Sequence, residues 1–205
     1  MIHSLWVGVT TVGAIGLFSG LARSTTLRGK IQCEKSWSSS IVHVVGLAVA
    51  IAAALSINNA YAAIAVGVLI AALCVSFVTD VRYGLIFDVV TIPCALFLGT
   101  FAWFEGTLVQ ALWGGATCAA IILLIFLMST GRGIGLGDLK LAACIGLALG
   151  VRYGVIAVGL AFIAGGVHGT ALLLTRCAKK GDALRFAPYL ALGSGLAIVA
   201  SWFAV

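Results

Sequence analysis

Long apolar runs, separated by short polar segments, fill most of the chain. A helix that crosses a bilayer core needs roughly 20 apolar residues, with a range of about 17–25. Eight runs approach this length, at about Leu5–Ala22, Ile41–Ile57, Tyr61–Val78, Val89–Phe104, Leu108–Ser129, Leu139–Leu149, Tyr153–Thr175 and Ala187–Ala204. The pattern predicts an all-α, polytopic membrane bundle of about eight helices, which form a single membrane domain over residues 1–205.

Two of the runs leave the number of full spans open. At 1.5 Å per residue, the run at Leu139–Leu149 reaches only about 16 Å, so it is a partial span or a shielded helix. The first run could also be a cleavable signal peptide, but no Lys or Arg precedes its apolar stretch. We therefore expect six to eight full spans.

Composition agrees with a membrane protein. Hydrophobic residues make up 62% of the chain and charged residues 9%, against about 25% charged residues in soluble domains. So little polar surface cannot coat a water-soluble globule, and the lipid bilayer must be the solvent. The net charge of +6 does not indicate nucleic acid, because the basic residues lie between apolar runs, where they set orientation.

The distribution of Lys and Arg predicts the topology. If the N-terminus is outside and the eight runs alternate, eleven of the twelve basic residues face the cytoplasm and only Arg152 does not. Cytoplasmic loops carry such an excess of positive charge. This topology places Asp80 and Asp138 at the same, cytoplasmic face of a multi-pass protein in the plasma (inner) membrane.

The metal-ligand residue types form no recognisable cluster. The six cysteines include no Cys-x-x-Cys pair, and His43 and His168 are single histidines on apolar runs. Such residues usually pack or form hydrogen bonds. We therefore expect no metal and no cofactor.

The six acidic residues include two that ordinary solvation does not explain. Asp80 and Asp138 each lie at the cytoplasmic end of an apolar run, and ionisable groups at membrane depth are costly and usually functional. For Asp138 an N-cap at the start of a helix is an alternative, compatible role. Asp88 is interpreted as the N-cap of the fourth run, and Glu34, Glu105 and Asp182 as solvated loop charges.

Alternating glycines precede Asp138 over Gly131–Gly137. Glycine permits close backbone approach, which suits an extended peptide lying beside the acid, although a flexible linker has the same composition. The Gly-Lys-Ser/Thr of a phosphate loop is absent. Two carboxyl groups brought together share one proton and can hydrolyse a peptide bond by general acid–base catalysis.

Three segments, in order, resemble the type IV prepilin peptidases over about Phe77–Gly193. Gly135-Leu136-Gly137-Asp138 resembles the second catalytic motif of this GxGD-type family. Asp80, followed later by Ile92-Pro93, resembles the first motif. The segment Arg185–Gly193, which contains Pro188, is similar to the start of the family's last span.

The resemblance implies an aspartic endopeptidase that cuts the short basic leader from prepilins or pseudopilins at the cytoplasmic face, for a type IV pilus or protein secretion. It assigns the catalytic roles to Asp80 and Asp138. The supporting motif residues are Gly135, Gly137, Lys140, Pro93 and Pro188. The substrate brings its own apolar N-terminal helix, so it can reach the enzyme from within the bilayer.

The sequence departs from the family pattern in several places. Long members carry two Cys-x-x-Cys pairs in a cytoplasmic domain after the first span and also methylate the new N-terminus. Here that segment is the shortened cytoplasmic loop 23–40 with only Cys33, so we expect no zinc and no N-methyltransferase activity. Cys94 follows Pro93, where many members have an acidic or amide residue.

The sequence allows two roles for Lys140 and two alternative functions for the chain. Lys140 is either an interfacial anchor that extends to the membrane surface or a cation that steadies the Asp138 motif. A small proton-coupled transporter or channel could use the same two aspartates, although no repeat is evident and both acids lie at one face. An inactive structural subunit of an assembly is a further alternative.

Overall fold

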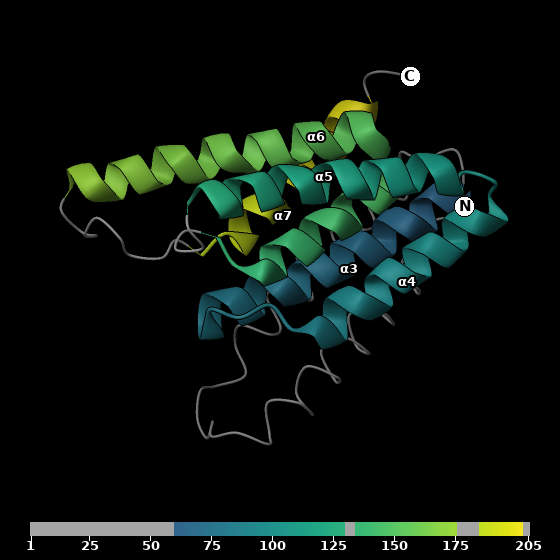
Figure 1. Ribbon diagram of the computed structural model, residues 1–205, viewed down its shortest axis with the longest axis horizontal. Helices are drawn as coiled ribbons and strands as arrows, with labels where there is room; N and C mark the ends of the chain where they lie inside the picture. Colours follow the sequence, from purple (N-terminus) through teal and green to yellow (C-terminus); the bar gives the residue numbers. More distant parts are fainter. Residues whose placement is uncertain (1–59, 130–133, 176–184, 203–205) are drawn as a thin grey trace.

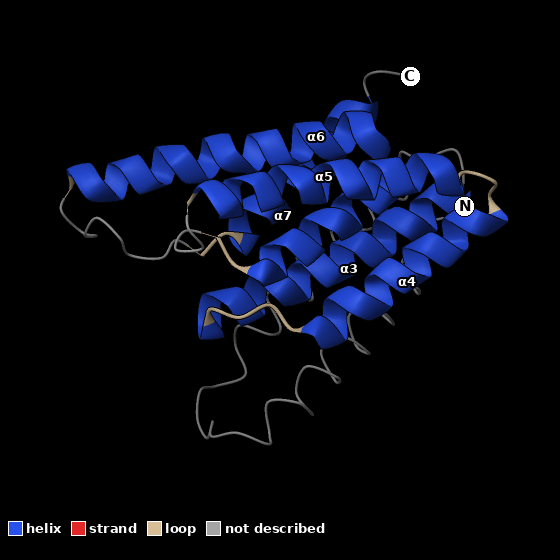
Figure 2. Cartoon of the chain, viewed as in Figure 1, coloured by secondary structure: helices blue, strands red, loops and turns tan. Residues whose placement is uncertain are grey.

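The computed structural model describes residues 60–129, 134–175 and 185–202. These residues contain five helices, α3 (Ala60–Tyr83), α4 (Asp88–Phe104), α5 (Leu108–Met128), α6 (Leu136–Leu174) and α7 (Ala187–Trp202). Short loops join α3 to α4 and α4 to α5, and the five helices pack side by side in one bundle (Figures 1 and 2). The prediction of an all-α fold is confirmed for the described residues.

Several helices are suited to a membrane. Three stretches are long and apolar enough to cross a bilayer, Ala63–Tyr83, Leu108–Met128 and Leu136–Ala171, while α4 and α7 are shorter apolar helices. The described part of the chain therefore has five helices rather than eight. The first two predicted runs and the loop 23–40 lie outside it, so the count of eight stays a prediction.

A break at Gly150 divides α6 into two segments, residues 136–149 and 151–174. Gly150 has φ 69° and ψ −175°, a backbone conformation that glycine adopts at no steric cost. The two segments run antiparallel (Figure 1), and a Cβ on Gly154 would lie 3.2 Å from the Cα of Gly146. The predicted sixth and seventh runs correspond to these segments, with the break where the sequence suggested it.

Small residues bring α5 and α6 into backbone contact. A Cβ on Gly114 would lie 2.7 Å from the carbonyl carbon of Gly150, and a Cβ on Gly146 would lie 2.8 Å from the nitrogen of Gly115. Small residues at helix interfaces permit such close approach in membranes. Between these contacts lies a continuous apolar core, whose largest fully buried side chains include Leu69, Ile122, Leu141, Ile145 and Leu190.

Many large apolar side chains lie on the outer surface. Large side chains such as Leu96, Trp103, Trp113 and Leu124 are more than half exposed. Water-soluble monomers rarely expose so much apolar surface, whereas the bilayer solvates it. The surface therefore supports the assignment as a membrane protein.

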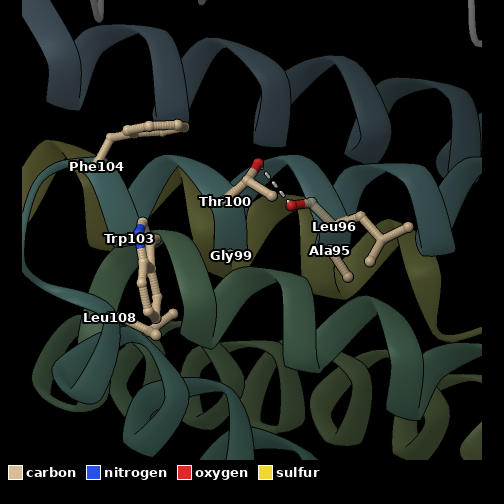
Figure 3. A pocket seen from close by; sticks show the side chains of 7 residues that line it. All are labelled: Ala95, Leu96, Gly99, Thr100, Trp103, Phe104 and Leu108. Atoms are coloured by element: carbon tan, nitrogen blue, oxygen red, sulfur yellow. Dashed lines mark hydrogen bonds between the residues drawn. The ribbon is translucent and has the colours of Figure 1, made fainter.

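A groove of about 390 Å³ lies on this surface beside α4 (Figure 3). Its lining consists of Ala95, Leu96, Gly99, Thr100, Trp103, Phe104 and Leu108. The Thr100 hydroxyl donates to the carbonyl oxygen of Leu96 at 2.9 Å, within its own helix. The groove therefore offers apolar contact and no acid–base group, and the candidate chemistry lies elsewhere.

Candidate functional site: two buried aspartates

The first aspartate lies in the last turn of α3. Asp80 is 6% exposed, and the helix continues past it to Tyr83, so the expectation that the run ends before Asp80 is wrong for the helix itself. The end is set by Gly84, which has φ 66° and donates its N–H to the Asp80 carbonyl oxygen at 2.8 Å. A left-handed glycine of this kind commonly terminates helices.

The carboxyl group of Asp80 is bound to another helix. Its Oδ2 accepts a hydrogen bond from the N–H of Ala187, the first residue of α7, at 3.1 Å. Free N–H groups at a helix start carry partial positive charge and favour an anion there. Pro188 follows in the first turn of α7, where its lack of an N–H costs nothing.

A second contact ties the start of α7 to the end of α3. The Arg185 guanidinium donates from Nη1 to the carbonyl oxygen of Val81. Arg185 and Ala187 therefore hold the two residues Asp80 and Val81 from the same segment. The sequence offered Pro188 as the marker of this segment, but neither donor was identified.

The second aspartate lies in the first turn of α6. Asp138 is 6% exposed and is the third residue of the helix, so the N-cap interpretation is wrong by three residues. Its Oδ2 accepts the N–H of Gly135 at 3.0 Å, while its own N–H donates to the Gly135 carbonyl oxygen at 3.1 Å. This is the side-chain half of a capping box, so Asp138 does satisfy a backbone donor at the helix start.

One oxygen of Asp138 is left for chemistry. Its Oδ1 is buried and has no hydrogen-bond partner in the described part of the chain. Buried carboxyl oxygens are nearly always paired, so an unpaired one is a marker of a functional site.

Gly137 brings the loop after Asp80 against the start of α6. A Cβ on Gly137 would lie 2.7 Å from the Cβ of Ile86, which belongs to the loop between α3 and α4. Glycine is therefore required sterically at this position. At Gly135 a Cβ would make an ordinary contact, 3.4 Å from Asp138 Oδ2, so that residue contributes mainly its N–H. Residues 131–133 of the glycine run lie outside the described residues.

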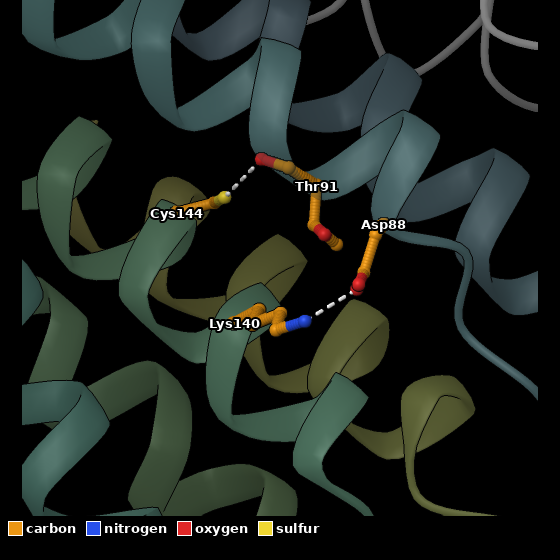
Figure 4. Close-up of polar contacts among 4 residues, drawn as sticks. All are labelled: Asp88, Thr91, Lys140 and Cys144. Atoms are coloured by element: carbon orange, nitrogen blue, oxygen red, sulfur yellow. Dashed lines mark hydrogen bonds and ion pairs between the residues drawn. The ribbon is translucent and has the colours of Figure 1, made fainter.

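Lys140 and Asp88 form an ion pair that the sequence did not predict. The Lys140 Nζ lies 2.6 Å from Asp88 Oδ1 (Figure 4). Asp88 is the first residue of α4 and Phe87 its N-cap, so the N-cap interpretation of Asp88 is also wrong. The sequence contains one indication of this pair, namely that Asp88 and Lys140 have opposite charges and lie at the same predicted membrane face.

The remaining candidates are peripheral. Pro93 lies on an exposed face inside α4, where it removes one helical hydrogen bond. His168 contacts the hydroxyl of Tyr189 through Nδ1. Among the residues that the structure describes, no three His, Cys, Asp or Glu side chains are grouped closely enough to hold a metal ion. That the protein uses no metal stays an expectation.

The fold and the site together define a helical membrane protein with two buried carboxyl groups at helix ends. Residues 67–170, about half of the chain, match the model of the type IV leader peptidase family, and the chain belongs to that family. This stretch contains both aspartates. The resemblance inferred from the motifs is thus confirmed.

Three relatives carry the name prepilin leader peptidase/N-methyltransferase. The protein from Bacillus subtilis is 34% identical over 137 residues, which are 63% of this chain and 53% of that protein. Those from Stutzerimonas stutzeri and Pseudomonas aeruginosa are 32% and 29% identical, over 58% of this chain and 44% and 43% of theirs. The chain thus spans about half the length of these relatives. No solved structure matches it significantly.

Proposed function

We propose that the chain is a membrane-embedded aspartic endopeptidase that removes the short basic leader from prepilins or pseudopilins, with Asp80 and Asp138 as its catalytic residues. Family membership and the names of the relatives support leader peptidase activity. The observation that carries the assignment is burial. Asp80 and Asp138 are the two acidic residues that are buried in the described part of the chain. The loop after Asp80 lies against Gly137, the residue before Asp138.

The proposed reaction is a general acid–base hydrolysis. One carboxylate accepts a proton from a water molecule, whose oxygen attacks the carbonyl carbon of the scissile peptide bond. The other carboxyl group, which is protonated, gives its proton to the carbonyl oxygen. When the tetrahedral diol collapses, the first carboxyl group gives its proton to the leaving amine and the C–N bond breaks. The second carboxylate takes a proton from a diol hydroxyl, so that both groups return to their starting protonation states.

Each carboxyl group is prepared for this role by one backbone N–H at a helix start. Asp80 takes that of Ala187 in α7, and Asp138 takes that of Gly135 before α6. These bonds fix one oxygen of each group and favour negative charge there. Groups fixed before the reaction do not need to reorganise during it, and Asp138 Oδ1 stays available for water or substrate.

The proposal includes the location of the reaction. The distribution of Lys and Arg favours an outside N-terminus and an active site at the cytoplasmic side of the plasma membrane. A substrate with its own apolar helix lies in the same lipid bilayer and enters laterally between helices. Methyl transfer is left out of the proposal, because residues 23–40 carry only Cys33 where long members have two Cys-x-x-Cys pairs.

The decisive experiment removes each carboxyl charge separately. Asp80→Asn and Asp138→Asn are purified and assayed on a prepilin, beside the matched control Glu105→Gln, which removes one carboxyl charge at the exposed turn after α4. Loss of a general acid or base lowers kcat by about 10²–10⁴-fold, so both Asn variants should lose cleavage and the control should keep it. Wild-type cleavage rates in either Asn variant would contradict the assignment.

A further inference from the structure

Two polar contacts, one helical turn apart, join the beginnings of α4 and α6 (Figure 4). The Lys140 Nζ lies 2.6 Å from Asp88 Oδ1, and the Cys144 thiol donates to the Thr91 carbonyl oxygen at 3.4 Å. Lys140 and Cys144 are four residues apart and Asp88 and Thr91 three, so each pair lies on one face of its helix. We call these four residues the α4–α6 seam.

The seam lies next to Asp138 along α6 but on another face. Lys140 follows Asp138 by two residues, and residues two apart on a helix do not face each other. The Asp138 side chain is buried, whereas the Lys140 side chain is 41% exposed and is bound by α4. Lys140 therefore influences Asp138 through the backbone of the first turn of α6 rather than by direct contact.

A third contact lies beside the seam, in the first turn of α6, which carries Asp138. Gly137 precedes Lys140 by three residues and so shares its face of α6. Its backbone lies against Ile86, two residues before Asp88. The first turn of α6 thus contacts the loop before α4 at Gly137 and the first residue of α4 at Lys140, on both sides of Asp138 in the sequence.

The two aspartates differ in how they are held. Asp80 is bonded to another helix through Ala187. The bond from Asp138 to Gly135 stays within its own helix start, and so it moves with that turn. The position of Asp138 relative to Asp80 therefore depends on the contacts that fix the first turn of α6. One of these contacts is the ion pair between Lys140 and Asp88 of α4.

We propose that Asp88 is a positioning residue. Through its ion pair with Lys140 it fixes the first turn of α6, and thereby the carboxyl group of Asp138 relative to that of Asp80. The role rests on the proposed function, because it concerns the alignment of the catalytic pair. Since the side chains are 41% and 56% exposed, the pair contributes little to stability, and its effect is expected in the rate of reaction.

Two independent roles would account for the same residues without positioning. Lys140 could anchor the helix end at the membrane surface, and Asp88 could favour the positive start of α4. Neither role requires the other residue. Exchanging the charges separates the explanations, because a reversed pair keeps the ion pair but puts a cation at the start of α4.

The experiment compares Asp88→Asn, Lys140→Met and the exchange Asp88→Lys/Lys140→Asp with wild type and Glu105→Gln. For each protein kcat and KM are measured on a prepilin in detergent, together with Tm. Each single variant should lower kcat about tenfold with KM nearly unchanged, since misplacement by 1 Å can cost about 100-fold. The exchange should recover kcat to within about threefold of wild type, and Glu105→Gln should not change it.

Each other outcome overturns a defined part of the inference. If the exchange is as slow as the single variants, or if KM alone changes, Asp88 has no positioning role. If a single variant lowers Tm by several degrees together with kcat, its effect is a loss of fold stability, and the positioning role is overturned as well. If wild type does not cleave, the proposed function fails and the positioning role with it. If wild type cleaves while the exchange stays slow, the proposed function stands and the positioning role alone is overturned.

Discussion

Gly137→Ala probes the close contact between the loop that follows Asp80 and the first turn of α6, which carries Asp138. The added Cβ would lie 2.7 Å from the Cβ of Ile86, and 3.4 and 3.5 Å from its Cγ1 and Cδ1. Carbon atoms pack best at about 3.5–4.0 Å, so Ile86 must withdraw by about 0.8 Å. Because the clash is with a Cβ, no change of rotamer relieves it, and the loop between α3 and α4 has to shift.

The magnitude follows from two opposing terms. Overpacking of this kind costs about 1–3 kcal/mol. Alanine is favoured over glycine in a helix by at most about 1 kcal/mol, so the net expectation is a loss of about 1–2 kcal/mol of stability. The rate of cleavage should fall further than stability does, because a displacement of nearly 1 Å at the turn that carries Asp138 can lower the rate by about 10–100-fold.

The assay combines thermal unfolding in detergent with prepilin cleavage. Gly99→Ala is the matched control, because that helical glycine has open space where the Cβ would be added; it should be as stable as wild type or slightly more so. In the Gly137→Ala background, Ile86→Gly removes the opposing Cβ and should restore part of the activity, with Ile86→Gly alone as its reference. If Gly137→Ala matches Gly99→Ala in stability and cleavage, the steric reasoning is refuted.

Three further predictions concern other parts of the molecule. Gly146→Ala should lower Tm more than Gly137→Ala does, because its Cβ would overlap the backbone of Gly114, which no rotamer change can move; an unchanged Tm would contradict the close α5–α6 packing. Mass spectrometry of a processed pilin should show a free N-terminal amine, and the mass of one added methyl group would contradict the expected lack of methyl transfer. Membrane-impermeant thiol reagents should label Cys33 and Cys177 from the cytoplasmic side only, and labelling of both from the outside would reverse the topology.

The apolar runs predicted the bounds of a helix correctly where the helix ends at the change from apolar to polar residues. The fourth run was expected at Val89–Phe104 and the fifth at Leu108–Ser129, within one residue of α4 and α5. At α3 the polarity changes at Asp80, whereas the helix ends at Tyr83. Hydropathy treats an acid as solvated, and it cannot recognise one that is buried because another helix supplies its partner.

The site was predictable residue by residue but not as a set of contacts. The distribution of Lys and Arg predicted that Asp80 and Asp138 share one membrane face, and the motif resemblance assigned them catalytic roles; both stay predictions. The bond from Ala187 to Asp80 joins residues 107 positions apart, and the Lys140–Asp88 pair spans 52. Which helix end meets which depends on packing between helices, and the period of apolar residues along one helix contains no information about that.

The reversal at Gly150 bears on the depth at which Asp138 would lie in a membrane. The two segments of α6 meet at this turn and differ in length: residues 136–149 span about 21 Å and residues 151–174 about 36 Å. The longer segment extends past the neighbouring helices (Figure 1) and suffices for a hydrocarbon core of about 30 Å; the shorter one does not. With the longer segment across the hydrocarbon core, the shorter one would end inside it, near Asp138. Under the proposed function, the scissile bond and a water molecule would then both have to reach Asp138 below the lipid surface.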